Sequence, residues 1–331
     1  MSSQQHPIRR RAALGLVLVS VPPALWWAVR GQGPASAPCV PPGRARAASM
    51  ACWGSSTVAE MSEYMRNTAA GYGLRYFNGG AGGQTAEQIL ARLGSRPARM
   101  DSAVIPSSGS VVLSTPSMSA RGAAPFGADG SLAGIPGTLS KAPGAQPGYS
   151  FRRHHAGKPR RIAEGTEFLP SKGAEFRAGI NHLNIGKNNL TGAPWATHDP
   201  DAILEWTHAA HDWLAAAGRQ ILVWGYFVNT GIPASSPVRD RISHVNRALQ
   251  ERYGRCFVDL AGLVTDLGAW ARTGLHPTWA DLQQQALGNM PPSLSRNSAH
   301  LNARGYQALR EVIDGRLREL NWAPSPGKLV T

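Results

Sequence analysis

The stretch SMACWGSSTVAEMSEYMRNTAAGYGLRYFN, residues 49–78, decides the fold. It begins with a short apolar run that ends in glycine at 49–54, which predicts a buried strand. Apolar residues at helical spacing follow over 56–73, and the segment 74–78 is again β-prone. Because strand, helix and strand in this order are typical of a βαβ unit, the sequence predicts a parallel sheet.

The rest of the chain repeats this alternation, with one long interruption. Further strands are predicted at 179–186, 219–227 and 256–260, and further helices at 85–94, 199–218, 238–253 and 302–320. The interval 95–172 instead holds short β-prone runs cut by Gly, Pro and Ser, and it is too long for a loop in a compact domain. We therefore expect an α/β domain over 49–94 and 173–325, with a β-rich inserted module at 95–172.

The composition is that of an ordinary globular protein with a basic excess. The 331 residues are 42% hydrophobic and 16% charged, and 34 Lys and Arg against 20 Asp and Glu give a net charge of +14. Such an excess favours anionic partners, but the arginines are scattered, so nucleic-acid binding is not predicted. The densest basic group could grip an anionic polysaccharide or form a solvated face. It consists of Arg152, Arg153, His154, His155, Lys158, Arg160 and Arg161.

The three cysteines, Cys39, Cys52 and Cys256, form no disulfide framework and show no metal-ligand spacing. Cys52 and Cys256 lie in apolar runs, so buried free thiols are expected at both positions. No cluster of His, Cys and Asp has zinc-like spacing, so a zinc site is not predicted.

The N-terminus predicts export. The basic segment HPIRRR precedes an uncharged apolar run at 12–29, which indicates a signal peptide or signal anchor over 1–37, followed by a linker at 38–48. Pro38 directly follows a small-residue sequence that resembles a cleavage site, so cleavage and membrane anchoring through 12–29 both stay open. In either case the remaining chain is expected outside the cytoplasm.

Four short stretches carry side chains suited to chemistry, each near the end of a predicted core element. They are GSST (54–57), NGGAGGQT (78–85), GKNNLTG (186–192) and NSAHLN (297–302). In an open parallel sheet such groups meet at the C-terminal ends of the strands. A serine, an imidazole, and backbone and amide donors together would form an acyl-transfer site. Each stretch alone is more often a helix cap, a turn, or a structural or solvated histidine. The order of four such stretches, each at the predicted end of a core element, favours a site.

The order of these stretches resembles that of the SGNH (GDSL-type) hydrolase family. GSST is similar to its nucleophile block, NGGAGGQT to its glycine block, GKNN to its asparagine block and NSAHLNARGY to its histidine block. The resemblance covers roughly 49–94 and 174–320, and the His-Leu-Asn-x-x-Gly-Tyr ending is distinctive. It implies a flavodoxin-like, three-layer α/β/α fold around a five-stranded parallel sheet, here with a small all-β insertion.

By residue, the resemblance implies that Ser56 is the nucleophile and His300 the base. The backbone N–H groups of Ser56 and Gly83, with the Asn188 side chain, would form the oxyanion hole. No cofactor is implied, because acyl transfer at such a site needs neither a metal nor an organic group.

Two positions depart from the family pattern. Ser55 stands where the nucleophile block normally has Asp, and Asn297 stands where the acid that orients the histidine is expected. An amide oxygen can hold the imidazole tautomer, but it stabilises the imidazolium poorly, and loss of the carboxylate costs several powers of ten in rate in a differently built triad. A backbone carbonyl or another acid could take its place, and Asp259, Asp266 and Asp281 lie in the C-terminal half.

The favoured function is therefore an exported serine esterase that forms an acyl-enzyme on Ser56. Its expected substrate is an acylated carbohydrate, with deacetylation of a cell-envelope polysaccharide as the leading reaction. The residues would equally serve acyl transfer to a sugar, a lipase or a thioesterase. A different class, a catalytically weak glycan-binding protein, is motivated by Ser55, Asn297 and the basic insertion. The sequence does not indicate an oligomeric state.

Overall fold

The computed structural model describes residues 47–118, 124–142, 148–192, 197–218 and 220–322. The predicted export segment at 1–37 and most of the linker at 38–48 lie outside these residues. Within the described parts of the chain, no helix is both long enough and apolar enough to cross a membrane.

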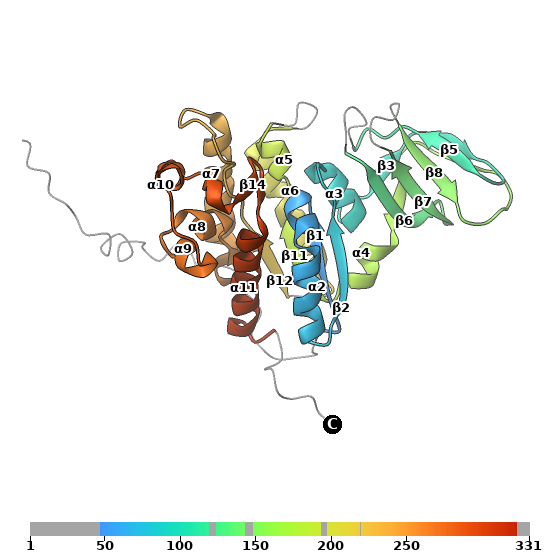
Figure 1. Ribbon diagram of the computed structural model, residues 1–331. Helices are drawn as coiled ribbons and strands as arrows, with labels where there is room; N and C mark the ends of the chain where they lie inside the picture. The colour runs from blue at the N-terminus through green and yellow to red at the C-terminus, as the bar shows by residue number, and fades with distance from the viewer. Residues whose placement is uncertain (1–46, 119–123, 143–147, 193–196, 219, 323–331) are drawn as a thin grey trace, which may run out of the picture. The chain divides into compact units, whose positions relative to one another are not determined.

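A five-stranded sheet in the order β13-β12-β11-β1-β2 forms the centre of the α/β part, and all its neighbouring strands are parallel (Figure 1). Its strands are β1 (Ser49–Gly54), β2 (Arg75–Gly80), β11 (Ile180–Asn184), β12 (Ile221–Trp224) and β13 (Phe257–Val258). Every residue of β1, β11 and β12 is buried, as expected for a parallel sheet with helices on both faces. The predicted fold class is confirmed.

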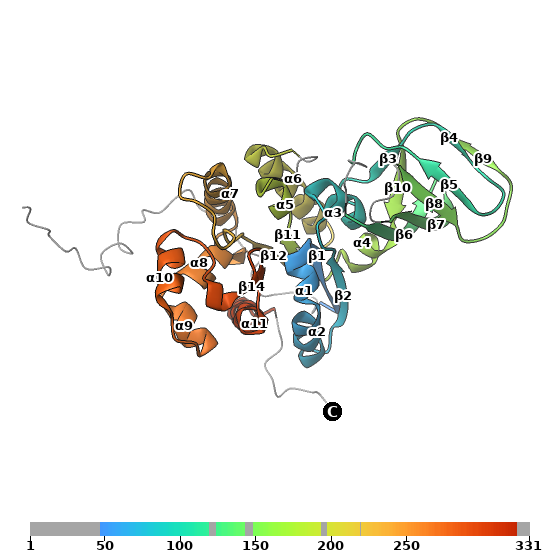
Figure 2. The same cartoon turned by 45° about the horizontal axis from the view of Figure 1, so that its top comes forward.

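The helices form a layer on each face of this sheet (Figure 2). One layer contains α3, α6 and α7, and the other contains α2 and α11. The predicted helix over 56–73 is divided at Met61, where ψ is −2°. The helices are α1 (Ser56–Glu60), α2 (Ser62–Gly71), α3 (Ala86–Leu93), α4 (Ser171–Phe176), α5 (Lys187–Leu190), α6 (Pro200–Ala215), α7 (Pro237–Tyr253), α8 (Leu260–Thr265), α9 (Gly268–Thr273), α10 (Trp279–Ala286) and α11 (Ala303–Glu319), with 3-10 turns η2 (Gly254–Cys256) and η3 (Pro292–Leu294).

Polar caps set the starts of the long helices. Asp199, Ser236 and Asn302 each accept a hydrogen bond from a backbone N–H in the first turn of α6, α7 and α11, respectively. Proline follows the cap in α6 and α7, where its missing N–H costs no hydrogen bond. These local signals explain why the helix starts could be predicted from the sequence.

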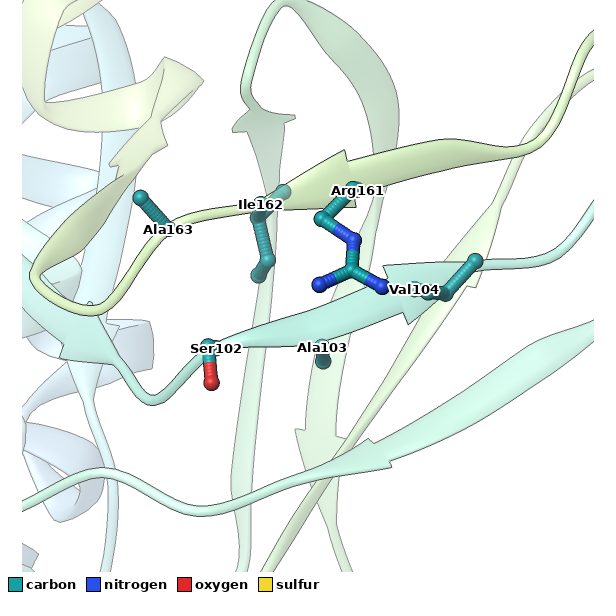
Figure 3. Close-up of a pocket in the computed structure, with 6 residues that line it drawn as sticks. All are labelled: Ser102, Ala103, Val104, Arg161, Ile162 and Ala163. Atoms are coloured by element: carbon teal, nitrogen blue, oxygen red, sulfur yellow. The ribbon is translucent and has the colours of Figure 1, made fainter.

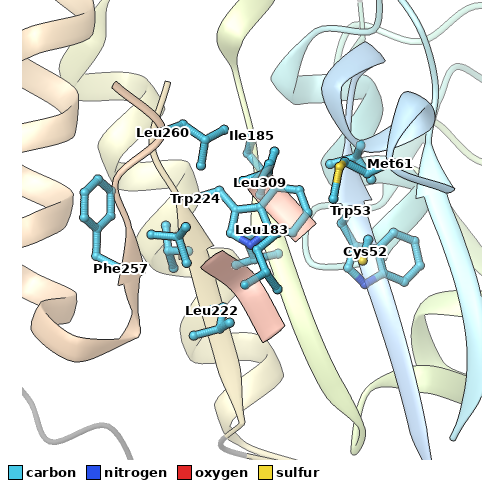
Figure 4. Close-up of a cluster of buried hydrophobic side chains, with 14 of the residues drawn as sticks. Cys52, Trp53, Met61, Leu183, Ile185, Leu222, Trp224, Phe257, Leu260 and Leu309 are labelled. Carbon is cyan, nitrogen blue, oxygen red and sulfur yellow. The ribbon is translucent and has the colours of Figure 1, made fainter. Parts of the chain in front are cut away.

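Large apolar side chains from the strands and the covering helices fill the core, including Trp53, Leu183 and Trp224 (Figure 4). Cys52 is a buried free thiol, as expected, and burial raises its pKa. Cys256 is disulfide-bonded, so the expectation of a free thiol there was wrong. An odd number of cysteines without recognisable spacing gave no sign of this bond.

The insertion forms its own antiparallel β structure. A six-stranded sheet has the order β3-β10-β6-β7-β8-β5, and β4 pairs with β9 in a separate ribbon. Its strands are β3 (Ala98–Met100), β4 (Ala103–Ile105), β5 (Ser110–Leu113), β6 (Phe126–Leu132), β7 (Ile135–Lys141), β8 (Tyr149–Arg153), β9 (Arg160–Ile162) and β10 (Thr166–Pro170). Aromatic residues, among them Tyr149, Phe151 and Phe168, fill its separate core. The entry strand β3 and the exit strand β10 are paired, with Ala98 opposite Phe168.

Not every member of the basic group in the insertion is free to bind a ligand. The Arg153 guanidinium donates hydrogen bonds to the backbone carbonyls of Pro106 at 2.7 Å and His155 at 2.6 Å. It also contacts the carbonyls of Gly157 and Lys158. Arg153 therefore holds the loop between β8 and β9.

Candidate active site

Hydrogen bonds connect three of the four stretches that the sequence analysis singled out. The backbone N–H of Ala81, in the glycine stretch, donates to the carbonyl of Gly54 at 3.1 Å, directly before the two serines. The Asn188 side chain at the start of α5 donates through Nδ2 to the carbonyl of Gln84 at 2.8 Å. The serine, glycine and asparagine stretches therefore meet at the C-terminal ends of β1, β2 and β11.

Two further contacts bring in the histidine stretch, which forms a small ribbon of β14 (Ser295–Asn297) and β15 (His300–Leu301). The Nζ atom of Lys187 lies 3.5 Å from the carbonyl oxygen of Ala299. On the other side, Arg296 makes a two-pronged ion pair with Glu60 of α1, at 2.8 and 3.0 Å. These contacts bring the glycine and asparagine stretches against the end of β1, and they bring the histidine stretch against Lys187 and against Glu60 of α1. Ser56, Gly83, Asn188 and His300 each lie in one of the four stretches.

The serine pair lies where β1 turns into α1. Ser56 is the first residue of the helix and is partly exposed, whereas Ser55 is fully buried. The turn packs closely on the end of β2, because a Cβ atom added at Gly80 would lie only 2.3 Å from the backbone nitrogen of Ala59. Of the two hydroxyls, only that of Ser56 is therefore accessible to a substrate.

Asn297, which stands in place of the expected acid, contacts the ring of His300. Asn297 Oδ1 lies 2.9 Å from His300 Nδ1 and accepts hydrogen bonds from the backbone N–H groups of Ala299 and His300, both at 3.0 Å. Because two N–H donors already converge on this atom, it must be the amide oxygen rather than the nitrogen. The third contact then requires a proton on Nδ1, so Nε2 is left with a free lone pair. Asn297 thereby fixes the tautomer that a general base needs.

The three acids considered as substitutes are engaged elsewhere. Asp259 caps α8 by accepting from the Gly262 N–H at 3.0 Å, and Asp266 pairs with Arg272 at 2.7 Å. Asp281 is buried and accepts hydrogen bonds from Thr278 and Ser293, which hold its pKa below its usual range although burial opposes them. Asn297 is therefore the residue that orients His300.

The surroundings of His300 are unusually positive. Partial burial lowers its pKa, the neighbouring Lys187 and Arg296 lower it further, and only Glu60 acts in the opposite direction. Lys187 is itself buried, with Nζ 3.3 Å from the centre of the Phe227 ring, and burial lowers its pKa to about 7. A triad acid would raise the pKa of its histidine, so this site favours the neutral imidazole instead.

The predicted oxyanion donors are available for a ligand. No hydrogen bond within the described chain takes up the backbone N–H of Ser56 or Gly83. Gly83 has φ of +74°, a left-handed conformation that glycine adopts without strain. Asn188 uses one of its two amide hydrogens on Gln84, which fixes the orientation of the side chain and leaves the second hydrogen for a substrate. Their roles in catalysis stay a prediction.

Three residues of the site were missed by sequence reasoning. Lys187 lies inside the quoted asparagine stretch, and its burial depends on the packing of α5, which no local pattern reveals. Glu60 and Arg296 are 236 positions apart, and each looks like an ordinary surface charge. No group of three or more His, Cys, Asp and Glu side chains in the described regions is arranged to hold a metal ion.

Comparisons with known proteins show a distant structural likeness only. No protein-family model matches the sequence, and no curated protein sequence matches it. Among solved structures, a GDSL-like lipase from Bacteroides thetaiotaomicron is 9% identical, with a TM-score of 0.44 over 82% of this chain and 88% of the other. A catalytic mutant of an acetylxylan esterase from Geobacillus stearothermophilus is 10% identical, with a TM-score of 0.44 over 86% of this chain and 100% of the other. Such distant matches assign no activity, so the site rests on its own geometry.

Proposed function

We propose that this chain is an exported serine esterase of the SGNH type. Its favoured reaction is the removal of acyl groups, above all acetyl groups, from a carbohydrate or a cell-envelope polysaccharide. The observation that carries the proposal is the contact of Asn297 Oδ1 with His300 Nδ1, which leaves Nε2 unprotonated and able to act as the base for Ser56.

In the proposed reaction, Ser56 Oγ attacks the ester carbonyl and its proton passes to His300 Nε2. The negative charge that develops on the carbonyl oxygen is stabilised by the N–H groups of Ser56 and Gly83 and by Asn188 Nδ2. His300 then gives its proton to the departing alcohol, which leaves an acyl group on Ser56. A water molecule, activated by His300, hydrolyses this acyl-enzyme and releases the acid.

Export and a carbohydrate substrate are each supported by one further observation. A disulfide at Cys256 is typical of proteins outside the cytoplasm, in agreement with the apolar segment at 12–29. The β-rich insertion touches the glycine stretch, since Gln84 Nε2 donates to the carbonyl of Pro125 at 2.7 Å. A polymer that binds along the insertion would therefore run close to the glycine stretch.

The test is labelling of the purified protein with a fluorophosphonate, together with release of p-nitrophenol from its acetate ester. We expect both activities in the wild type and neither in Ser56→Ala or His300→Ala. Ser55→Ala is the matched control, because it removes the neighbouring buried hydroxyl and should leave both activities intact. Wild-type protein that neither labels nor turns over any acetyl ester or acetylated glycan would refute the proposal and favour a glycan-binding protein.

A further inference from the structure

The structure contains a cavity of about 270 Å³ where the insertion meets the edge of the parallel sheet. Its walls come from β1, β2, α3 and α4 on one side and from β6, β7 and β10 of the insertion on the other. Residues that decide its chemistry are Trp53, Phe77, Arg92, Asp129, Thr138 and Lys172. Cavities for drug-sized ligands measure about 300–1,000 Å³, so this one suits a single sugar-sized group.

Arg92 supplies a buried positive charge at this cavity. Its Nε donates to Gln84 Oε1 at 2.8 Å, and its Nη2 donates to the carbonyls of Gly79 at 2.7 Å and Gly54 at 3.5 Å. All these acceptors are neutral, and the hydrogens on Nη1 have no partner within the described chain. Burial lowers the pKa of Arg92 to about 10, so it stays protonated at neutral pH. A buried charge is costly unless it is paired, so a carboxylate that entered here would stabilise it.

The remaining walls combine an aromatic face with polar groups. Phe77 packs against Trp53, with 5.2 Å between the ring centres, and both line the cavity. From the insertion, the Thr138 hydroxyl donates to Asp129 Oδ1 at 2.5 Å. Lys172 adds positive charge, because its carboxylate partner Glu175 is shared with Arg75. An apolar face opposite hydrogen-bonding groups suits a sugar ring, whose faces are apolar and whose rim carries hydroxyls.

We propose that this cavity binds one acidic sugar residue, a hexuronate, with its carboxylate on Arg92 Nη1 and its ring against Phe77. A planar guanidinium matches a planar carboxylate better than it matches a single hydroxyl. The inference names the substrate class of the proposed esterase and to that extent rests on it: the acylated polymer contains uronate. Because Arg92 also bonds to Gly54, the bound residue lies beside the strand that leads to Ser56.

A second hollow, of about 570 Å³, does not offer the same chemistry (Figure 3). All its lining residues belong to or adjoin the β4–β9 ribbon, at 102–104 and 161–163. Its one charged side chain, Arg161, is exposed and is therefore satisfied by water. This hollow lacks a buried charge that a ligand would neutralise, so it carries no proposal.

The first arm of the test measures binding in the Ser56→Ala protein, where no ester can be turned over. Sodium glucuronate, glucose and inorganic phosphate are titrated separately and followed by calorimetry and saturation-transfer NMR. We expect glucuronate to bind at least ten-fold more tightly than either of the others. Equal affinities for glucuronate and glucose would show that Arg92 does not bind the carboxylate. A higher affinity for phosphate than for glucuronate would indicate a general anion site. Either result overturns the proposal.

The second arm blocks the cavity without touching Arg92, whose loss could unfold the end of β1. Gly127 lies on β6 and lines the cavity, and a Cβ atom added there meets no atom within 4 Å. Gly127→Phe should therefore weaken glucuronate binding at least ten-fold. Gly71→Phe, at an equally open position at the end of α2, is the matched control and should bind as the parent does. Unchanged binding in Gly127→Phe would overturn the proposal.

The two proposals fail in distinguishable ways. Glucuronate binding without esterase activity in the wild type would refute the esterase and leave the sugar site standing. Hydrolysis of acetyl esters by a protein that does not bind glucuronate would refute the sugar site alone.

Discussion

Replacement of Asn297 by aspartate is the most informative perturbation of this site. In the structure, Asn297 Oδ1 already accepts two backbone N–H groups at 3.0 Å and lies 2.9 Å from His300 Nδ1. An aspartate oxygen can occupy the same position without movement of the backbone. Because residue 297 is exposed, the second carboxylate oxygen would stay in water. Asn297→Asp therefore changes the charge of the site and little else.

The expected gain follows from what the amide already does. In the well-studied serine protease triad, exchange of Asp for Asn costs about 10⁴ in kcat because the histidine takes the wrong tautomer. Here the two backbone donors hold Oδ1 toward the ring, so the correct tautomer is already present and only the charge is missing. Hydrogen bonds to charged groups contribute about 1–1.5 kcal/mol more than neutral ones. Since about 1.36 kcal/mol corresponds to a factor of ten in rate, Asn297→Asp should raise kcat for an acetyl ester about ten-fold.

The assay is steady-state hydrolysis of p-nitrophenyl acetate over a range of pH. The new carboxylate should also raise the pKa of His300, so the acidic limb of kcat/KM should move to higher pH. Asn297→Ala is the companion variant and should lose most activity, since it no longer fixes the tautomer. A gain of a thousand-fold or more in Asn297→Asp would mean that the wild-type tautomer is wrong. A loss would mean that the neutral amide is itself required; either result refutes the reasoning.

Three further predictions concern charge and burial. Lys187→Met removes a cation that lowers the pKa of His300, so the acidic limb of kcat/KM should move to higher pH, whereas Lys158→Met in the insertion should leave it in place. His182 is buried, both its ring nitrogens lack a partner in the described structure, and burial lowers its pKa from 6.5 to about 3. Between these two pH values His182 is protonated in the unfolded chain but neutral in the folded chain. The free energy of unfolding therefore decreases as the pH falls from about 6.5 toward 3, by on the order of a few kcal/mol. His182→Leu should flatten this loss in thermal unfolding measured against pH; an unchanged slope would show that other groups dominate. Arg296→Met breaks the ion pair with Glu60 and should lower kcat several-fold. The melting temperature should change little, because exposed ion pairs contribute little to stability. Arg66→Met breaks the exposed ion pair with Glu63 and should change neither kcat nor the melting temperature.

Local signals in the sequence were sufficient for most of the fold. The strands β1 and β11 are uninterrupted buried runs, and α6 and α7 begin at a polar cap followed by proline, so each could be predicted from a few neighbouring residues. The division of the first predicted helix at Met61 could not, because apolar spacing continues through it. The disulfide at Cys256 could not be predicted either, because the residues around this cysteine form an ordinary apolar run.

The candidate site was less predictable, because its chemistry depends on atoms that the residue types do not fix. Asn297 could be seen as a missing acid, but its correct orientation comes from the backbone N–H groups of Ala299 and His300. Lys187 could be read in the chain, yet its effect on His300 depends on burial against Phe227. In the sequence Arg92 resembles any arginine on a helix, and only the structure shows that its guanidinium donates to the carbonyl of Gly79 in the glycine stretch.

The pairing of β3 with β10 has a consequence for how this chain could have arisen. Because the first and last strands of the insertion are hydrogen-bonded neighbours, the chain leaves the α/β part and returns to it at almost the same place. Such a module can be acquired or lost in evolution with little disturbance to the surrounding sheet. Its backbone carbonyls accept hydrogen bonds from Gln84 and Gln88 of the α/β part, so the module is connected to the glycine stretch. Loss of the module would also release Gln84, the residue to which both Arg92 and Asn188 bond.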